Sequence, residues 1–348
     1  MKNRWYGIMN SLLAAVVIIL LPTSCSVIDD DLSDCGSDYQ LDYELQLVTN
    51  MTTELSTQLT TMTDLKLAAA LRTHLTNIFT DFAHDVDLSF YDVGGDSVLL
   101  QHDSHIMDDN QASYTLYLPK RRYMHLAVAN VVNNPVVSIA DEKLCHKAIL
   151  KQPITDTISS HTTGVFTARE QMQVLEGVDQ TFNVHLYMAN CATTLVVDTV
   201  GSDVRDVKVF TTGFASSFCI ADSAYQFAEK APIVRTQKVD TGTDELTFCS
   251  VNFPSKDVLP SRSVIETIDP FVSATAENSL WEFRVYVTLK DGSVTETILY
   301  LNTPLRAGQL RLLKCWISKN GGANPKDQTV GVQVTTQWNS GGQYEPEL

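Results

Sequence analysis

The sequence has few basic residues. Lysine and arginine together number 25, against 41 aspartates and glutamates, so the formal net charge is −16. Phosphate backbones and anionic lipid heads attract positively charged protein surfaces. The charge balance therefore argues against nucleic-acid binding and against docking on anionic lipid heads, and we expect no nucleic-acid partner.

Signatures of catalysis and of bound cofactors are also missing. The sequence contains no GxSxG nucleophile motif, no phosphate loop with GK[ST], and no CxxC or Cys/His ladder of the zinc type. His102 and His105 are three residues apart in a strand-like segment, where their side chains point to opposite faces, so a solvated hairpin explains them better than a metal site. We therefore expect no enzyme activity, no cofactor and no metal.

No apolar run is long enough to span a bilayer, which takes about 20 residues. The longest candidate is the ten-residue run "LLAAVVIILL", from Leu12 to Leu21, which follows the basic residues Lys2 and Arg4. A short apolar core behind a positively charged start is typical of a signal peptide. We predict that residues 1–24 are a signal peptide, whose removal takes the formal charge from −16 to −18.

The residue after the predicted cleavage site is a cysteine. Small polar Thr23 and Ser24 lead into Cys25, a pattern that is similar to a lipobox. Two or three acyl chains, including palmitate, on Cys25 would exceed the two-chain threshold for stable membrane anchoring. The alternative is ordinary cleavage that leaves Cys25 as a free thiol or a disulfide partner. Residues 25–40 are then an acidic tether, and its cluster Asp29–Asp31 is either a signal for the outer face of the outer membrane or a solvated spacer.

Six further cysteines follow Cys25 in the sequence. An even number in an exported chain permits disulfides, but the spacings are wide and do not fix the pairing. Three of the six sit in apolar strand-like segments, where a free cysteine behaves as a small hydrophobic residue. We expect one or two bridges at most among Cys35, Cys145, Cys191, Cys219, Cys249 and Cys315.

Hydrophobic periodicity in the first half of the mature chain predicts strands around one helix. "LDYELQLVT" (41–49) alternates apolar and polar residues, as a strand does, whereas 64–82 repeats at three and four residues and predicts a helix capped by Thr63 or Asp64. Beyond it, 85–93 and 97–103 flank a Gly-Gly turn and predict a hairpin. Segments 112–119 and 122–132 predict a second strand pair, turned by Pro119 to Arg122.

The second half opens near residue 181 and is again rich in strands. "LWEFRVYVTLKDGSVTETILYL" (280–301) predicts an antiparallel hairpin turned at Asp291-Gly292, and "VGVQVTTQW" (330–338) predicts a final strand. Many short strands with no βαβ alternation indicate a mainly all-β protein. We predict two β-sandwich domains, residues 41–180 and 181–348, with one helix inserted in the first.

The order of these features resembles the FimB/Mfa type of fimbrial anchor subunits of Bacteroidales. The similarity is carried by the lipoprotein cysteine, "IDDDLSDC" (28–35), "LDYELQL", the helix, "VDLSFYDVGG", "YTLYLPKRRYMHLAVANV" and the last strand. The resemblance implies two transthyretin-like Greek-key sandwiches. It also implies a lipid-anchored subunit at the cell outer membrane, exposed on the surface, that holds a fimbrium made of fimbrillin stalk subunits and serves adhesion and biofilm formation.

The resemblance also implies assembly by strand exchange between subunits. Related stalk subunits lose an amino-terminal strand after an arginine or lysine, but here no Lys or Arg lies between Cys25 and Lys66, so we expect 41–47 to stay in place. The carboxy-terminal strand either donates to a neighbouring subunit or completes the chain's own second sandwich. The candidate donor residues are Val330, Val332, Val334 and Trp338.

A second class of function remains open from the sequence, a surface-exposed lipoprotein that binds a glycan or a host protein as an adhesin without being part of a filament. Such a protein is expected to display aromatic residues on a loop or on an exposed sheet face. The available residues, which the sequence explains more simply as core, are Tyr39, Tyr91, Tyr225 and Trp316.

Overall fold

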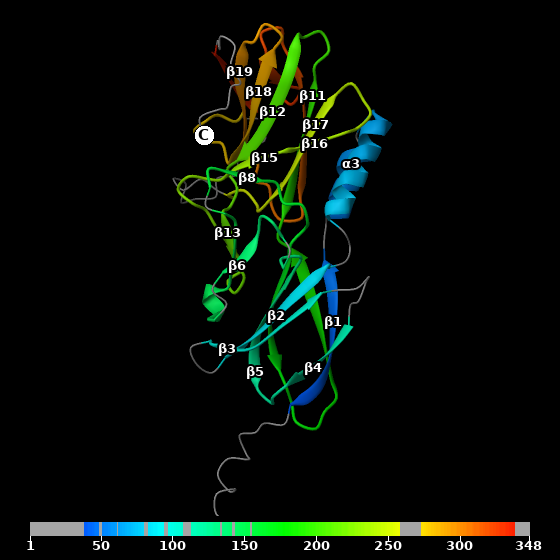
Figure 1. Ribbon diagram of the computed structural model, residues 1–348, viewed down its shortest axis with the longest axis vertical. Helices are drawn as coiled ribbons and strands as arrows, with labels where there is room; N and C mark the ends of the chain where they lie inside the picture. Colours follow the sequence, from blue (N-terminus) through cyan, green and yellow to red (C-terminus); the bar gives the residue numbers. More distant parts are fainter. Residues whose placement is uncertain are drawn as a thin grey trace, which may run out of the picture.

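The computed structural model describes residues 38–48, 51–60, 62–79, 83–93, 97–106, 113–132, 134–140, 143–153, 155–257 and 273–337. Within these ranges the chain is mostly β-strand, arranged in two stacked β-sandwiches with two helices beside the second (Figure 1). The predicted mainly all-β class is confirmed. The predicted signal peptide, Cys25, Cys35 and Trp338 lie outside the described residues.

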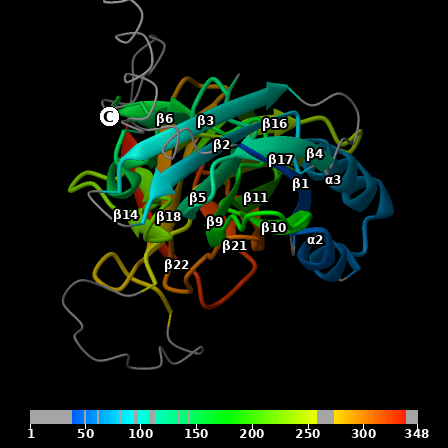
Figure 2. The same cartoon turned by 90° about the horizontal axis from the view of Figure 1, so that it is seen from below.

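The first sandwich is one seven-stranded sheet that folds over on itself, in the order β3-β2-β5-β9-β10-β1-β4. Adjacent β9 and β10 pair through two residues only, whereas β5 and β9 pair through eight, so the sheet bends between β9 and β10 into two facing layers (Figure 2). The strands are β1 (Tyr39–Val48), β2 (Asp85–Asp92), β3 (Leu99–Ile106), β4 (Ser113–Leu118), β5 (Arg122–Ala129), β9 (Phe166–Gln173) and β10 (Gln180–Met188).

The second sandwich consists of two separate sheets. The five-stranded sheet contains β16 (Gln237–Val239), β17 (Leu246–Asn252), β11 (Cys191–Asp198), β20 (Leu310–Ile317) and β21 (Ala323–Pro325), in that spatial order. The six-stranded sheet contains β22 (Gly331–Gln337), β19 (Val294–Leu301), β18 (Trp281–Leu289), β12 (Val204–Thr212), β15 (Ile233–Arg235) and β8 (Thr157–Ser159). Apolar residues of both sheets form one core between them.

The predicted hairpin of the second half is confirmed. β18 and β19 pair antiparallel around Asp291-Gly292, and Gly292 has φ 87°, a left-handed conformation that glycine adopts without steric cost. The side chains of one face of β18 are buried in the core, as their alternation predicts: Trp281, Phe283, Val285, Val287 and Leu289.

Two helices separate β1 from β2, where the sequence predicted one. α3 (Leu65–Ile78) begins at Asp64, whose carboxylate accepts the backbone N–H groups of Lys66 and Leu67 at 2.9 and 3.1 Å. It ends four residues before the predicted end. The additional helix is α2 (Met51–Thr60), whose many Thr and Ser residues have modest helix propensity, so its pattern is weak.

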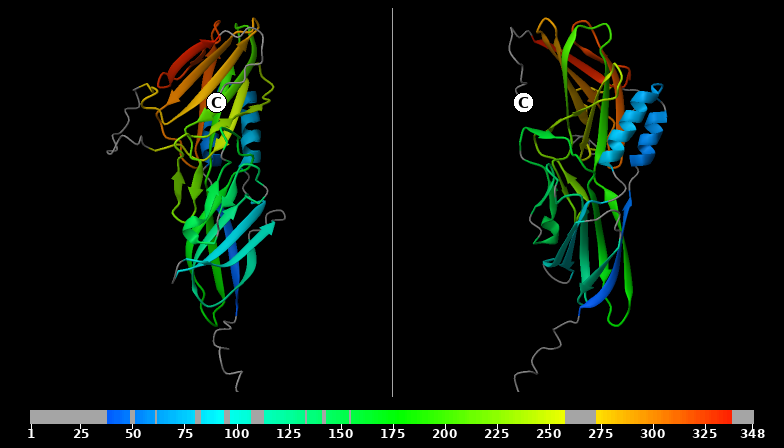
Figure 3. Two further views of the ribbon diagram at one scale, coloured as in Figure 1. Left: turned by 60° about the vertical axis from the view of Figure 1, so that its left-hand side comes forward. Right: turned by 45° about the vertical axis from the view of Figure 1, so that its right-hand side comes forward.

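The helices pack on the second sandwich although they follow a strand of the first. α2 contacts β20, and α3 contacts β16 (Figure 3). The buried stripe of α3, which includes Leu67, Leu71 and Leu75, joins Val196 and Leu310 of the five-stranded sheet in one apolar cluster. In sequence the helices are inserted between two strands of the first sandwich, as predicted, but in space they cover an outer face of the second sandwich, because that face carries the apolar side chains that bury them.

A small sheet covers the junction of the two sandwiches. Its strands, in spatial order, are β14 (Ala224–Gln226), β13 (Ser217–Cys219), β7 (Ile149–Lys151) and β6 (Ser138–Ala140), and the 3₁₀ turn η1 (Cys145–Lys147) precedes β7. Its apolar side packs on Tyr91, Leu126 and Val128, which point outward from β2 and β5. Strands from the two halves of the chain thus pair in this sheet.

The sheet topology bears on two predictions, the pairing of two strands in the first half and the boundary between the domains. The predicted pairing of 112–119 with 122–132 is wrong, because β4 pairs with β1 and β5 pairs with β2 and β9, so the turn between β4 and β5 connects the two layers. The predicted boundary at 180 and 181 falls at the start of β10, which lies in the first sandwich. The division into domains 41–180 and 181–348 stays a prediction.

Candidate assembly site

The carboxy-terminal strand β22 lies at an edge of the six-stranded sheet. It pairs antiparallel with β19, with Val332 opposite Leu299 and Val334 opposite Thr297. In this structure the strand therefore completes the chain's own sheet, the second of the two alternatives that the sequence left open. No strand of the described chain pairs with its other side.

Two of the candidate donor residues point toward the core and are nevertheless half exposed. Opposite residues of an antiparallel pair share a face, and Leu299 and Thr297 are fully buried, so Val332 and Val334 face the inside of the sandwich. Their exposed fractions are 43% and 44%, because the facing sheet ends at the three-residue strand β21. The inward face of the sheet is thus incompletely covered at this edge.

The start of β22 is fixed more firmly than its middle. Val330 is buried in the core, and a side chain at Gly331 would overlap the carbonyl oxygen of Ala274. The preceding turn is held by Asp327, which accepts hydrogen bonds from Thr329 and, at 2.7 Å, from the Arg311 guanidinium. Burial alone would raise the pKa of Asp327, but these donors outweigh it and lower the pKa.

Strand β1 occupies the middle of its layer, between β10 and β4. It alternates as predicted: Leu41, Tyr43 and Leu45 are buried, whereas Asp42 and Glu44 are exposed. It pairs with β10 through eight residues and with β4 through six. Neither edge of β1 is therefore free to pair with a strand of another chain.

A buried histidine holds β1 against the opposite layer. The Tyr43 hydroxyl lies 2.5 Å from His125 Nε2, and His125 Nδ1 lies 3.1 Å from the carbonyl oxygen of Ser89. The carbonyl accepts, so Nδ1 carries the proton and Nε2 accepts from the tyrosine. The ring stacks on Phe90, with centroids 4.4 Å apart. Burial lowers the pKa of His125 to about 4, so the ring is neutral at neutral pH.

Buried polar contacts fix the second sandwich to the first. His161 lies between the side-chain amides of Gln152 and Asn190, at 2.6 and 2.7 Å, and Asn190 belongs to the short link between β10 and β11. The Gly308 backbone N–H donates to the Asn190 carbonyl oxygen at 2.8 Å. The link is thereby held from two segments that are distant in sequence.

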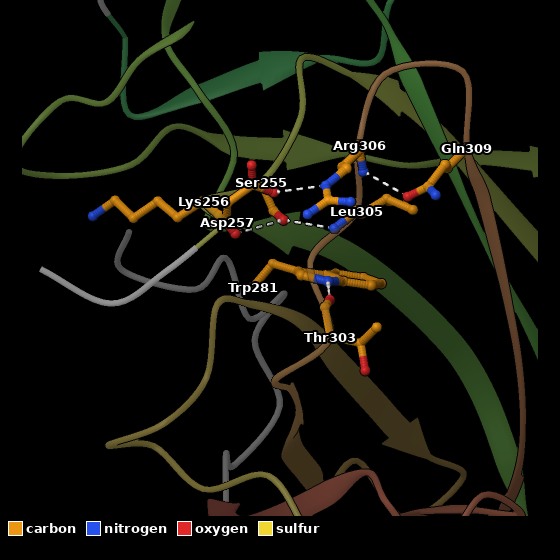
Figure 4. A network of polar contacts seen from close by, with 8 residues as sticks. All are labelled: Ser255, Lys256, Asp257, Trp281, Thr303, Leu305, Arg306 and Gln309. Carbon is orange, nitrogen blue, oxygen red and sulfur yellow. Dashed lines mark hydrogen bonds and ion pairs between the residues drawn. The ribbon is translucent and has the colours of Figure 1, made fainter. Parts of the chain in front are cut away.

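Segment 303–309, which contains Gly308, is hydrogen-bonded to residues 255–257, which follow β17 (Figure 4). Leu305 N–H donates to Ser255 Oγ at 2.8 Å, and Arg306 Nε lies 3.1 Å from an Asp257 oxygen. The Trp281 indole N–H donates to the Thr303 carbonyl oxygen at 2.9 Å. These contacts support a fixed arrangement of the two sandwiches.

The residues considered for binding or metal chemistry do not assemble into a reactive centre. His102 Nε2 lies 2.8 Å from the carboxylate of Asp87, and the described residues hold no group of three or more His, Cys, Asp or Glu that could bind a metal. No helix within the described residues is long and apolar enough to cross a membrane. A cavity of about 800 Å³ opens between β7, β13 and segment 228–232. Its charged residues are Lys151, Asp156 and Lys230, of which Asp156 and Lys230 pair with each other at 2.9 Å.

The four aromatic residues suggested for a binding surface have different environments. Tyr91 is fully buried, and Tyr39 and Tyr225 are partly buried against core clusters. The fourth differs from the expectation of a core residue: Trp316 is 46% exposed. It lies on β20 opposite Asp198, at the end of β11 away from the first sandwich. The sequence could not distinguish this residue from its buried neighbours, because both faces of β20 carry apolar residues.

Comparison with known proteins gives a likeness in fold. No protein-family model and no curated protein matches the sequence. A candidate adhesin of Bacteroides ovatus ATCC 8483 has a TM-score of 0.51 at 11% identity, over 83% of this chain and 95% of that one. The fimbrial anchor protein Mfa2 of Porphyromonas gingivalis has a TM-score of 0.45 at 10% identity, over 86% and 98%.

The tip fimbrial protein Mfa3 of the same organism, with a carboxy-terminal truncation, has a TM-score of 0.41 at 10% identity, over 86% of this chain and 100% of that one. The Bacteroides ovatus structure shows that the present chain is similar in fold to a candidate adhesin. The predicted resemblance to Bacteroidales surface proteins is therefore confirmed at the level of the fold.

Proposed function

We propose that this protein is a lipid-tethered anchor or minor structural subunit of a fimbrium, held at the outer membrane through acyl chains on Cys25. The resemblance of its sequence motifs to fimbrial anchor subunits supports this function, and so does its fold, which it shares with a candidate adhesin. No catalytic step is part of the proposal. Its partners are the membrane on one side and fimbrillin stalk subunits on the other.

The observation that carries the proposal is the position of β1. The strand lies in the middle of its layer with Leu41 and Tyr43 buried, and no Lys or Arg between Cys25 and Lys66 offers a trypsin-like protease a site to release it. A subunit that keeps this strand has no vacancy there for a strand from another subunit. It would therefore end a filament rather than extend it in both directions, as an anchor does.

The position of the tether agrees with an anchoring role. Described residue 38 leads into β1 at the end of the first sandwich that faces away from the second (Figure 1). Cys25 precedes it by only thirteen positions (38 minus 25). A lipid on Cys25 would then place the first sandwich nearer the membrane, with the second sandwich and β22 pointing outward.

We further propose that β22 and its candidate donor residues contact the neighbouring subunit. Its free edge and the half-exposed, inward-facing Val332 and Val334 support this contact, because an unpaired strand edge is a template for a strand of another chain. Donation in the strict sense requires β22 to leave β19. Addition of a strand beside β22 leaves it in place, and both routes use the same residues.

The membrane part is tested with Cys25→Ser, because acylation requires the thiol. The variant should be released into the soluble fraction or accumulate as unprocessed precursor, and globomycin should cause the precursor of the native chain to accumulate. Fractionation and immunoblotting measure both effects. Serine at position 25 with normal membrane retention would contradict the lipoprotein assignment.

The assembly part is tested by the double variant Val332→Asp, Val334→Asp in the native host. Charges at these two half-exposed positions should leave the chain folded and membrane-bound but reduce the amount of pilin that copurifies with it after crosslinking of intact cells. The matched control is Val200→Asp, which changes a 78%-exposed valine in the loop between β11 and β12. An unchanged pilin ladder from the double variant would refute the role of β22, and a native chain that captures no pilin would refute the anchor function.

One observation favours the alternative of a surface lipoprotein that binds a glycan or host protein without a filament. Trp316 is half exposed on the sandwich distal to the tether, and an exposed indole face is suited to stacking on a sugar ring or to an apolar contact. Trp316→Ala should abolish cell adhesion under this alternative but leave the pilin ladder intact under the anchor function.

A further inference from the structure

Cys145 and Cys219 lie in one buried cluster beneath the small sheet. Cys145 begins η1 and is 6% exposed, whereas Cys219 ends β13 and is 3% exposed. Both belong to the apolar cluster between the small sheet and the outer face of the first sandwich. They are 74 positions apart in the sequence (219 minus 145), and the fold brings them to the same end of this sheet.

Backbone contacts connect the two cysteines closely. Cys219 Sγ lies 3.8 Å from the carbonyl oxygen of His146, the residue after Cys145. Ala148 N–H donates to the Cys145 carbonyl oxygen, and Ile220 N–H donates to the Ala148 carbonyl oxygen, both at 3.1 Å. The residue that follows Cys219 is thus joined to Cys145 through two successive hydrogen bonds. The two thiols also lie close enough to interact electrostatically, because ionised Cys219 would contribute to raising the pKa of Cys145.

We propose that Cys145 and Cys219 form a disulfide in the exported protein. The inference rests on export, which is part of the proposed function, because disulfides persist in oxidising compartments. The other described cysteines lie elsewhere: Cys191 and Cys315 in the core of the second sandwich, and Cys249 in the cluster beneath the helices. All five described cysteines are thiols in this structure, so the bond forms by oxidation of a pair that the fold has already brought together.

The surroundings of the two sulfur atoms disfavour the thiolate form of both cysteines. Burial raises the pKa of the Cys145 thiol, and the Arg169 guanidinium opposes that rise. Burial also raises the pKa of Cys219, whose Sγ lies 3.4 Å from the Asp222 carboxylate and donates to it. The thiolate is the nucleophile in thiol–disulfide exchange. Once it is deprotonated, either cysteine can therefore begin the exchange.

The reaction needs a disulfide donor, either a protein disulfide of the cell envelope or oxidised glutathione. In one order of exchange, the Cys145 thiolate attacks one donor sulfur, which forms a mixed disulfide and releases the other donor sulfur as a thiol. Cys219 loses its proton to solvent and attacks the Cys145 sulfur, which forms the intramolecular bond and releases the second donor thiol. Two electrons pass from the cysteines to the donor, and their two protons end on the donor thiols or in solvent.

The bond would reinforce the least extensive sheet of the molecule. Each of its strands β6, β7, β13 and β14 has three residues. A bridge across 74 positions removes much of the freedom of the unfolded chain, and that loss stabilises the folded state. It would also join the segment that covers the first sandwich to the second half of the chain.

The test uses full-length protein purified from the cell envelope without reductant, alkylated under denaturing conditions and digested with trypsin. Mass spectrometry should find the peptide 144–147 linked to 209–230, with more than nine-tenths of both cysteines protected from alkylation until reductant is added. The same linkage should form when reduced, folded protein is exposed to oxidised glutathione in vitro. That second arm does not depend on export, so failure of the export assumption is separated from failure of the geometry.

Variants extend the test to stability. Reductant should lower the melting temperature of the native chain by about 5–15 °C, and it should have no effect on Cys145→Ser or Cys219→Ser; Cys145→Ala and Cys219→Ala serve as backup variants if the serine chains misfold. Cys315→Ser is the matched control and should keep the full response to reductant. Free, alkylated Cys145 and Cys219 after oxidation in vitro, or a linkage from either residue to Cys35 or another cysteine, would overturn the proposal.

Discussion

His125 contributes a pH dependence to the stability of the first sandwich. Its ring is fully buried between Tyr43 and Phe90, and its pKa in the folded protein is about 4, below the ordinary value of about 6.5. As the pH falls below 6.5 the unfolded chain binds a proton that the folded chain does not yet bind. Stability is therefore complete above that pH and is lost progressively down to about pH 4.

We expect this histidine to account for up to ~3 kcal/mol of lost stability between pH 7.5 and pH 4. The measurement is urea unfolding at several pH values for the native chain and for the paired variant Tyr43→Phe, His125→Phe, which removes both hydrogen-bonding groups together. The pair should flatten that part of the profile. His161, whose pKa is lowered by burial to about 3, remains in the variant and supplies the residual slope. An unchanged profile would mean that His125 is not neutral in the fold.

At the scale of elements, the amino-terminal cap of α3 depends on one side chain. The Asp64 carboxylate accepts two backbone N–H groups that have no partner within the helix. Asp64→Ala should destabilise the protein by about 1 kcal/mol, whereas Asp64→Asn should cost much less because it keeps the acceptor. Chemical denaturation of the two variants measures the difference. Equal losses would show that the negative charge matters, rather than the capping hydrogen bonds.

Sequence periodicity predicted the elements whose signal is local. The alternation of β1, the β2–β3 hairpin, α3 and the β18–β19 hairpin all follow from their own residues and turns. Pairing between strands that are distant in the sequence could not be predicted from their residues. The sequence of β4 and β5 predicts a hairpin because Pro119 makes a turn between them. In the structure β4 pairs with β1 in one layer and β5 pairs with β2 in the facing layer.

Weak patterns were missed for a related reason. α2 is rich in Thr and Ser, and the three-residue strands of the small sheet are too short to show a period. The candidate assembly site was partly accessible: its alternating valines were found, but only the structure shows that Val332 and Val334 face inward at an uncovered edge.

At the scale of the whole molecule, the helices make the two sandwiches interdependent. The apolar cluster beneath α3 continues from the core of the first sandwich to the outer face of the five-stranded sheet. Loss of one sandwich would expose the surface that the other needs. We therefore expect a single cooperative unfolding transition in calorimetry.

Leu71→Ala tests this coupling. Leu71 is fully buried beneath α3, so its truncation should cost about 3 kcal/mol and lower the temperature of the whole transition. Leu65→Ala, in the same helix but at an 81%-exposed position, is the matched control and should change little. Two separated transitions in the Leu71 variant would show that the sandwiches unfold independently.

The parallel pairing of β1 with β10 has a mechanical consequence. The proposed tether would pull β1 from its amino-terminal end, whereas β10 would be pulled from its carboxy-terminal end, because β11 of the second sandwich follows directly. In parallel strands these two forces are opposed along the strand axis, so tension loads the pair in shear. The hydrogen bonds between 41–48 and 180–187 must then break together rather than one after another. A molecule stretched between a membrane and a surface filament would carry that load on two strands that pair over eight residues.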